Sequence, residues 1–366
     1  MANTSTASEL VVKKYLSDFF KEYIRNNRFS RYTGTGNNNV ITIKEGRQQI
    51  SVPLVTRLQG SGVSGSSTLR GNGESIGNYG LTLTPTYFRN AVEFDKEEME
   101  KPAIDLMRAA RPLLMDWGME LTRDHVIEAM CAIYNGTTYS NYGSATDAAL
   151  DLWLTNNSDR ILYGAALSNT SAGNHSTSLG NIDTTADKLD RGIVSIAKRL
   201  AKNADPHIRP IRTSEDEEWF VMFAGSYAFR DLKADMDTTH SNAMPRSKTA
   251  NPIFTDGDLV YDGVIIREIP EIESFVDNQW GADAASADGL DNAGATSSRI
   301  APCFLCGAQA LSFGLGQRPQ VIVDRDYDYG FQPGVAVELK HDIDKSYFNN
   351  VQHGMVTCFV SSAADS

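Results

Sequence analysis

The longest helical pattern in the chain spans residues 95–134. Apolar residues recur there at spacings of three and four positions, which predicts an amphipathic helix. Its apolar stripe consists of Leu106, Ala110, Leu113, Trp117 and Leu121. Asp95 stands in a capping position with Glu98 three residues later, which is typical of a helix start, whereas Pro112 predicts a bend or a second start. One long helix and two helices in series both fit this pattern, and the rest of the fold is organised around it.

Strand patterns on either side of a glycine- and serine-rich stretch predict an extended two-stranded ribbon. Residues 40–58 and 79–94 alternate or carry β-branched side chains, and the residues between them form the tip. A lone ribbon buries too little surface to be stable in water, so it must lie against other protein. We expect that surface to belong to another copy of the same chain.

A second amphipathic pattern lies at the N-terminus, where residues 7–26 predict a helix. One face is apolar and comprises Val12, Leu16, Phe19 and Tyr23, widened by Leu10, Tyr15, Phe20 and Ile24. A face this apolar needs a docking surface. Residues 33–39, rich in glycine and asparagine, are predicted to form a flexible hinge before the ribbon.

The remainder of the chain mixes helical and strand patterns, which indicates an α+β fold. Residues 135–182 are polar and are predicted to be an irregular excursion with a short helix at 147–154. Further helices are predicted over 184–204 and 228–235, and a polar loop over 277–298. The predicted strands are 219–223, 251–254, 260–266, 321–323, 335–339 and 355–360.

The composition is that of a globular protein rather than a disordered one. The 366 residues can hold about two domains, and 41% are hydrophobic while 22% are charged. We expect no membrane span and no signal peptide, because no long uncharged apolar stretch is present. Four cysteines do not make a disulfide framework and suggest synthesis in a reducing cytoplasm.

The charge is unevenly distributed along the chain. Residues 1–92 carry eleven Lys and Arg against five acidic residues, a net charge of +6, so the remainder must carry −18 to give the total of −12. A basic arm joined to an acidic body is electrostatically complementary to another copy of itself, although a merely solvated distribution is also possible. A nucleic-acid-binding arm is disfavoured, because the basic residues lack interleaved stacking aromatics.

Several short motifs resemble chemical sites but lack the required context. Residues 60–65 satisfy G-x-G-x-x-G and residues 73–77 satisfy G-x-S-x-G, yet neither is followed by the helix that a dinucleotide site or a nucleophile elbow requires. The alternating Asp324, Asp326 and Asp328 resemble a calcium loop, but Tyr329 stands in place of its glycine. An acidic surface turn is the simpler interpretation, and a weak cation contact stays open.

The cysteines and histidines are also without a catalytic or metal-binding arrangement. Cys303 and Cys306 form C-x-x-C without a second ligand pair, so we interpret them as small buried hydrophobic residues. The six histidines never occur two to a motif. We therefore predict no catalytic residue, no cofactor, no metal site and no enzymatic activity.

The order of the parts resembles that of the major capsid proteins of tailed bacteriophages, the HK97-like (Johnson) fold. The amino-acid sequence of these parts is more similar still to the N-four-like phage capsid group. The resemblance covers most of the chain from about residue 50 to 311. It is carried by packing and turn signatures at residues 53–58, 79–83, 88–92, 229–235, 251–254, 261–266 and 305–311.

The resemblance implies a fold with an N-terminal arm, an extended β-ribbon called the E-loop, a long spine helix, and peripheral and axial domains. The corresponding segments are 1–39 for the arm, 40–94 for the E-loop, 95–204 for the peripheral domain with its spine helix, 205–335 for the axial domain, and 336–366 for C-terminal strands that return to the body.

The function that the resemblance implies is that of a structural subunit. Copies would self-assemble into hexamers and pentamers of an icosahedral head around double-stranded DNA, without sequence-specific DNA binding, after synthesis in the host cytoplasm. Portal, scaffolding or decoration proteins would be further partners, and another phage structural component (tail or decoration protein) is the alternative. The residues we predict to contact other copies are Phe19, Phe20, Arg57, Arg70 and Arg89.

Overall fold

The computed structural model describes residues 25–58, 60–100, 105–136, 138–212, 218–236, 259–280 and 289–365. Two compact units are present. The larger unit contains Arg28–Pro85, Arg123–Gly316 and His341–Ser366, and the smaller unit contains Thr86–Thr122 and Gln317–Lys340 together with the described residues before Arg28. The chain passes from one unit to the other within one helix, α2 (Leu106–Cys131), and within two strands, β14 (Leu311–Asp324) and β15 (Gly334–Lys345).

The core of the larger unit is a seven-stranded mixed sheet with strand order β11-β12-β10-β13-β18-β8, and β9 pairs with β10 at its side. Its strands are β8 (Ile161–Tyr163), β9 (Ile211–Arg212), β10 (Glu218–Ala224), β11 (Leu259–Tyr261), β12 (Val264–Glu268), β13 (Ile300–Cys306) and β18 (Met355–Ser361). The central strand β10 is parallel to β12 and antiparallel to β13. Every residue of β13 and of β18 is buried, which is expected of strands covered on both faces.

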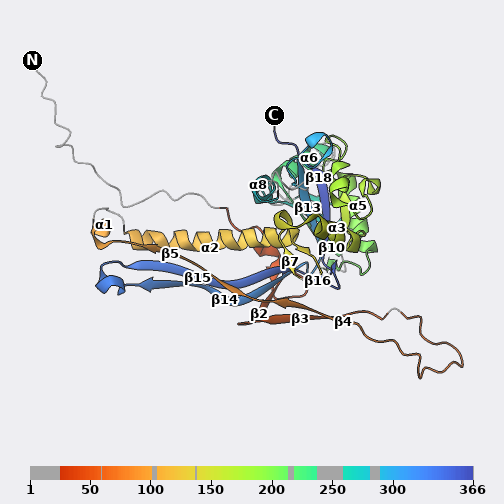
Figure 1. Ribbon diagram of the computed structural model, residues 1–366, viewed down its shortest axis with the longest axis horizontal. Coiled ribbons are helices and arrows are strands. Elements are labelled where there is room, and N and C mark those ends of the chain that lie inside the picture. The colour runs from red at the N-terminus through yellow and green to blue at the C-terminus, as the bar shows by residue number, and fades with distance from the viewer. Residues whose placement is uncertain are drawn as a thin grey trace, which may run out of the picture. The chain divides into compact units, whose positions relative to one another are not determined.

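Helices cover both faces of this sheet (Figure 1), which makes a three-layer core. On one face, α5 (Arg191–Asn203) and α6 (Ser226–Asp235) pack against the even-numbered residues of β10, such as Phe220 and Met222. On the other face, α3 (Asp147–Asn156), α8 (Glu271–Asn278) and the end of α2 pack against Val221 and Phe223. The alternation along β10 follows from the two-residue period of a strand.

Side-chain caps fix where several of these helices begin. The Asp190 carboxylate accepts a hydrogen bond from the Ile193 N–H at 2.7 Å, and Asn174 caps α4 (His175–Gly180) by accepting from the Thr177 N–H at 2.7 Å. Thr146 does the same for α3. Such caps satisfy N–H groups that have no partner within the helix.

The larger unit also holds several short elements and the ribbon. The strands are β1 (Thr33–Gly34), β2 (Ile41–Glu45), β3 (Ile50–Val55), β4 (Asn78–Leu83), β6 (Ile133–Tyr134), β7 (Tyr139–Ser140), β16 (Tyr347–Phe348) and β17 (Val351–Gln352). The 3₁₀ turns are η2 (Ser30–Tyr32), η3 (Tyr142–Ser144), η4 (Leu167–Asn169) and η6 (Ala295–Ser297). β2 lies between β1 and the first residues of β14, whereas β3 and β4, among the strands of the described residues, pair only with each other, as an antiparallel ribbon.

The smaller unit has a separate core between a helix and a sheet. β5 (Thr86–Glu93) is next to β15, which is next to β14. The hairpin of β14 and β15 turns at η7 (Tyr327–Gly330), and α1 (Lys96–Glu100) follows β5. Val335, Val337 and Leu339 of β15 are buried against Leu114 of α2. The Phe94 N–H donates to the Pro333 carbonyl at 3.0 Å, which ties the end of β5 to the hairpin.

Most of the predicted elements are confirmed, with five corrections to the ribbon and the helices. Residues 41–45 pair with β14 and not within the ribbon, and the break at Thr84–Pro85 makes β5 a strand of another sheet. α2 runs unbroken through Pro112 but ends at Cys131, because Ile133 and Tyr134 form β6. Residues 184–190 precede α5 and are not helical. Arg25 and Asn26 are not helical either, while the rest of the predicted 7–26 helix lies outside the described residues, as does the predicted strand 251–254.

Two regions predicted to be loose are ordered parts of the fold. The excursion 135–182 contributes Leu150, Trp153 and Tyr163 to the core, because its apolar residues cluster on α3 and β8 despite the polar average. The predicted hinge 33–39 contains β1, which pairs in parallel with β2. Just before it, the buried Phe29 packs edge-to-face on Phe223 with ring centroids 5.0 Å apart.

Candidate assembly surface

The base of the ribbon packs on its own unit. In the antiparallel register, Ile50 lies opposite Leu83 and Val55 opposite Asn78. Leu81 and Leu83 are buried together with Phe348, and Ile50, Val52, Leu54 and Tyr139 pack around them. The base of the ribbon therefore lies against other protein, as predicted, through one apolar face. That protein is the same chain and not another copy.

Beyond Val55 and Asn78 the two strands separate into a tip, residues 56–77, that extends from the ribbon (Figure 1). Large apolar side chains stand exposed on and beside this tip: Val55 (62%), Leu58 (60%), Leu69 (69%), Ile76 (64%) and Tyr79 (37%). Scattered exposed apolar residues are ordinary on a protein surface, but several on one protruding segment make the tip a candidate interaction site.

Local hydrogen bonds and glycines shape the tip. The Thr56 N–H donates to the Gly77 carbonyl at 3.0 Å, and the Gly60 N–H donates to the Glu74 carboxylate at 2.7 Å. Gly62, Gly65 and Gly71 have φ angles of 70°, 69° and 91°, which glycine adopts without the steric cost that a side chain would bring.

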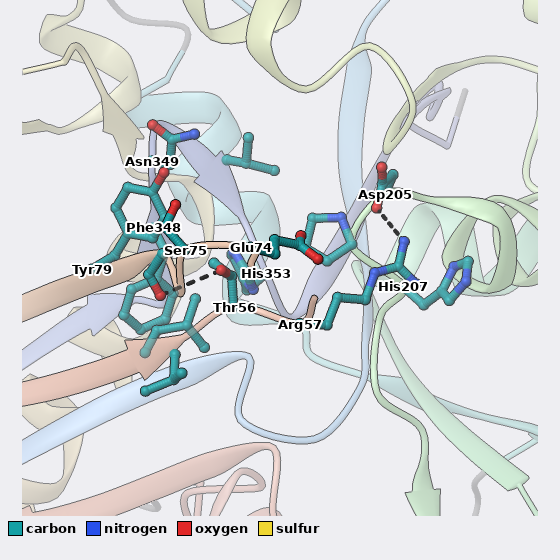
Figure 2. Close-up of a pocket in the computed structure, with 15 residues that line it drawn as sticks. Thr56, Arg57, Glu74, Ser75, Tyr79, Asp205, His207, Phe348, Asn349 and His353 are labelled. Atoms are coloured by element: carbon teal, nitrogen blue, oxygen red, sulfur yellow. Dashed lines mark hydrogen bonds and ion pairs between the residues drawn. The ribbon is translucent and has the colours of Figure 1, made fainter. Parts of the chain in front are cut away.

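A pocket of about 670 Å³ opens where the tip leaves the ribbon (Figure 2). The ribbon supplies Leu54 to Arg57 on one side, and Glu74, Ser75, Gly77 and Tyr79 on the other. The facing wall comes from residues 205–207, after α5, and from the β16–β17 hairpin with His353. The pocket thus separates the ribbon from the body of the unit at the point where the apolar base ends.

One ion pair bridges the pocket. Arg57 donates to an Asp205 carboxylate oxygen at 2.9 Å, as Figure 2 shows, and both side chains are more than half exposed. The backbone of Asp205 is held in turn by the fully buried Arg160, which donates to its carbonyl at 2.9 Å. Exposed ion pairs contribute little to stability, so this contact orients the ribbon more than it stabilises the fold.

The His353 imidazole in the pocket wall is neutral at physiological pH. Burial and the nearby positive charge of Arg160 lower the pKa of His353 to about 4. Its ring stands edge-on to Phe348 with centroids 5.0 Å apart, and the backbone N–H of His353 donates to the Ser346 carbonyl at 2.9 Å. These contacts are those of a structural side chain.

The predicted contact residues are dispersed in the structure. Arg57 lies at the pocket, Arg70 is exposed at the ribbon tip, and Arg89 is exposed on β5 in the smaller unit. Phe19 and Phe20 lie outside the described residues. The sequence reasoning missed Leu58, Leu69 and Ile76, whose signal was only single apolar residues within a glycine- and serine-rich stretch.

The motifs with apparent chemistry occur in the contexts that the sequence indicated. No helix begins within residues 60–77 as far as they are described, and β4 follows the G-x-S-x-G segment. Cys303 and Cys306 are both buried and point to opposite faces of the sheet, which confirms them as packing residues. Among the described residues, no group of three or more His, Cys, Asp or Glu side chains is arranged to hold a metal ion, and no helix is long and apolar enough to cross a membrane.

Comparison with known proteins decides which kind of protein carries this surface. The family model described as phage capsid protein matches residues 3–364. The chain belongs to the phage capsid protein family. The capsid of cyanophage Pam1 is 33% identical over 100% of both chains, with a TM-score of 0.89. No curated protein sequence matches the chain.

More distant solved structures share the fold. The capsid of Ralstonia phage GP4 is 19% identical over 100% of both chains, with a TM-score of 0.71. The head of Helicobacter pylori bacteriophage KHP40 is 16% identical, covering 97% of this chain and 95% of that one, with a TM-score of 0.64. The predicted resemblance to an HK97-like major capsid protein is confirmed, and the chain is a virion protein that self-associates into an icosahedral phage head. The tail and decoration alternatives find no support in these relatives.

Proposed function

We propose that the chain serves the shell in a purely structural, non-enzymatic way, as hexamers and pentamers that enclose double-stranded DNA. The observation that carries this proposal is the difference between the two ends of the ribbon. Its base is covered by its own unit, whereas Leu58, Leu69 and Ile76 at its tip are exposed to solvent. Apolar surface of this kind gains free energy when another surface covers it. In a protein that self-associates, another copy is the available cover.

The proposed contacts at the tip are both apolar and electrostatic. Arg70 follows Leu69 at the tip, so an apolar contact and a positive charge are presented together. The part of the chain beyond residue 92 carries a net charge of −18, which offers a neighbouring copy complementary charge. Many modest contacts of this kind act together once several copies are joined, through high effective concentration.

The charge also supports enclosure of DNA without sequence-specific binding. An acidic body repels phosphates, so packaged DNA would remain mobile rather than bound to the wall. Portal, scaffolding or decoration partners and assembly in the host cytoplasm follow from the family resemblance, and they stay predictions.

We propose the following division of the chain in capsid terms: arm 1–39, E-loop 40–94, peripheral domain 95–204, axial domain 205–335 and returning strands 336–366. The β3–β4 ribbon within 40–94 and the long α2 within 95–204 support the second and third assignments. The two compact units are defined by packing and cut across these segments, so they do not test the division.

Deletion of residues 60–73 tests the role of the tip. We expect the shortened chain to fold with an unchanged melting temperature, because none of the deleted residues is buried. We expect few or no closed shells by electron microscopy, because the surface offered to another copy is gone. The matched control replaces Leu58, Leu69 and Ile76 by Ser at full tip length, and it should reduce shell yield in the same direction. Normal shells from both variants would refute the proposed contact.

A further inference from the structure

As far as the residues of the smaller unit are described, they leave a second apolar surface uncovered, a groove of about 310 Å³ between α2 and the end of β5. Its walls are Leu106, Ala109, Ala110, Leu113, Leu114 and Trp117 from α2, with Asn90, Val92 and Phe94 from β5 and the residue after it. None of these side chains is charged. Leu113 remains 45% exposed although it belongs to the apolar stripe of α2.

This groove requires an apolar occupant with a particular spacing. The α2 residues that line it include Leu106, Ala110, Leu113 and Trp117, which follow one another at intervals of four, three and four positions. Helices whose apolar residues alternate at three and four positions pack with knobs of one helix in holes of the other. The small Ala109 and Ala110 leave room for such a close approach.

The N-terminal sequence has the matching pattern. Val12, Leu16, Phe19 and Tyr23 follow one another at the same intervals of four, three and four, and none of them is charged. The ribbon tip fits this groove less well, because its apolar residues are interspersed with Arg57, Arg70 and Glu74. An uncharged groove disfavours charged groups, which would lose their hydration there without gaining a partner.

We propose that the apolar face of residues 7–24 of a second copy occupies the groove between α2 and β5. The inference rests on the proposed function, because only a protein that associates with its own copies has this segment at hand in trans. It adds a specific pair of surfaces to the shell: the segment from one subunit and the groove of the next. Exchange of terminal segments links each copy to a neighbour and raises the effective concentration of every other contact.

Cysteine cross-linking between two populations of subunits tests this pairing. One population carries Leu113→Cys and the other Phe19→Cys, and they are assembled together and oxidised in air with copper phenanthroline. The native cysteines Cys131, Cys303, Cys306 and Cys358 are buried, so background linkage should be low. We expect a covalent dimer on a non-reducing gel, at about tenfold the yield obtained when Met115→Cys replaces Leu113→Cys. Met115 is 39% exposed on α2 and does not line the groove.

The remaining outcomes are decisive. A chain that carries both Leu113→Cys and Phe19→Cys and forms only an internal link would show that a subunit fills its own groove, which overturns the second-copy assignment. Equal dimer yields from Leu113→Cys and Met115→Cys, in particles that are normal by electron microscopy, would refute the groove while leaving the shell function intact. Failure of the unmodified protein to form shells would instead refute the proposed function. If Phe19→Cys prevents assembly, Leu16→Cys on the same face replaces it.

Discussion

The central sheet and the ribbon tip of the larger unit handle apolar residues in opposite ways. Every residue of β13 and β18 is buried beneath helices of the same chain, whereas Leu69 and Ile76 at the tip are 69% and 64% exposed. The sheet therefore stabilises the subunit by itself, and the tip contributes only when something covers it. On the proposed function, folding and assembly depend on different sets of apolar residues, and substitutions can separate the two.

The largest effect is expected in the sheet. Phe223 on β10 is fully buried and contacts the rings of Phe29 and Tyr32 at centroid distances of 5.0 and 5.8 Å. Replacement of a buried phenylalanine by alanine removes transfer free energy and leaves a cavity, at a cost of about 3–5 kcal/mol. We expect Phe223→Ala to lower the free energy of unfolding by that amount in guanidinium titrations.

Leu69→Ala at the tip is the matched control for this substitution. It removes a side chain that is largely in water, so the free energy of unfolding should change by less than about 0.5 kcal/mol. Its effect should appear in shell yield instead. Similar losses of stability from both substitutions would show that the tip is part of the subunit core, and the distinction drawn above would fail.

The sequence reveals the sheet better than it reveals the tip, for a physical reason. A buried strand such as β10 needs a continuous apolar run, Trp219–Phe223, which is visible without any knowledge of its neighbours. The amphipathic stripe of α2 is visible in the same way. Pro112 left open whether the helix continues. In the structure it does continue, and it packs through Leu114 against β15, which lies more than 200 residues away.

The parts that sequence reasoning missed depend on distant partners. Residues 41–45 have a strand pattern that fits a ribbon as well as a sheet, and only pairing with Leu311–Leu315 decides between them. The pocket at the ribbon base joins Arg57 to Asp205, 148 residues apart, without a motif in either segment. Likewise, the tip residues carry no local signal, because an exposed leucine in a glycine-rich loop is not distinguished by its spacing.

A buried histidine provides a second, somewhat smaller effect on the free energy of unfolding, and this effect depends on pH. His341 on β15 is 2% exposed, stacks on Phe313, and lies with its Nε2 2.9 Å from the Nδ1 of His125 on α2. Burial, and to a smaller extent the charge of His125, lower the pKa of His341 to about 4. Because the folded-state pKa lies below the unfolded value of about 6.5, this histidine destabilises the fold as pH falls from 6.5 to 4.

Comparison with a variant that lacks the imidazole shows whether His341 lowers the stability as the pH falls. The stability difference between wild type and His341→Gln should fall by on the order of 3 kcal/mol between pH 7 and pH 4, measured by denaturant titration at each pH. Asp344 on the same strand should act in the opposite direction, because burial and the nearby Asp342 raise its pKa to about 7. Asp344→Asn should therefore remove a stabilisation that grows as pH falls from 7 to 4. A constant difference for His341→Gln would contradict the interior assignment.

The smallest effect is expected at the boundary between the two regions, in the ion pair of Arg57 and Asp205. Their side chains are 56% and 67% exposed, and exposed pairs contribute only about 0.2–1 kcal/mol, less at high salt. We expect Arg57→Ala, Asp205→Ala and the double variant to give a coupling free energy within that range. A larger coupling that resists salt would mean that the ribbon is part of the folded core.

The same two variants also separate orientation from assembly. Each removes the ion pair equally, so a role limited to orienting the ribbon predicts equal losses of shell yield from Arg57→Ala and Asp205→Ala. If Arg57 also contacts another copy, as predicted from the sequence, Arg57→Ala should lower the yield more, because the guanidinium would lose a partner outside its own subunit as well as the one within it. A greater loss from Asp205→Ala would exclude that contact, since removing Asp205 leaves Arg57 free to bind a neighbour.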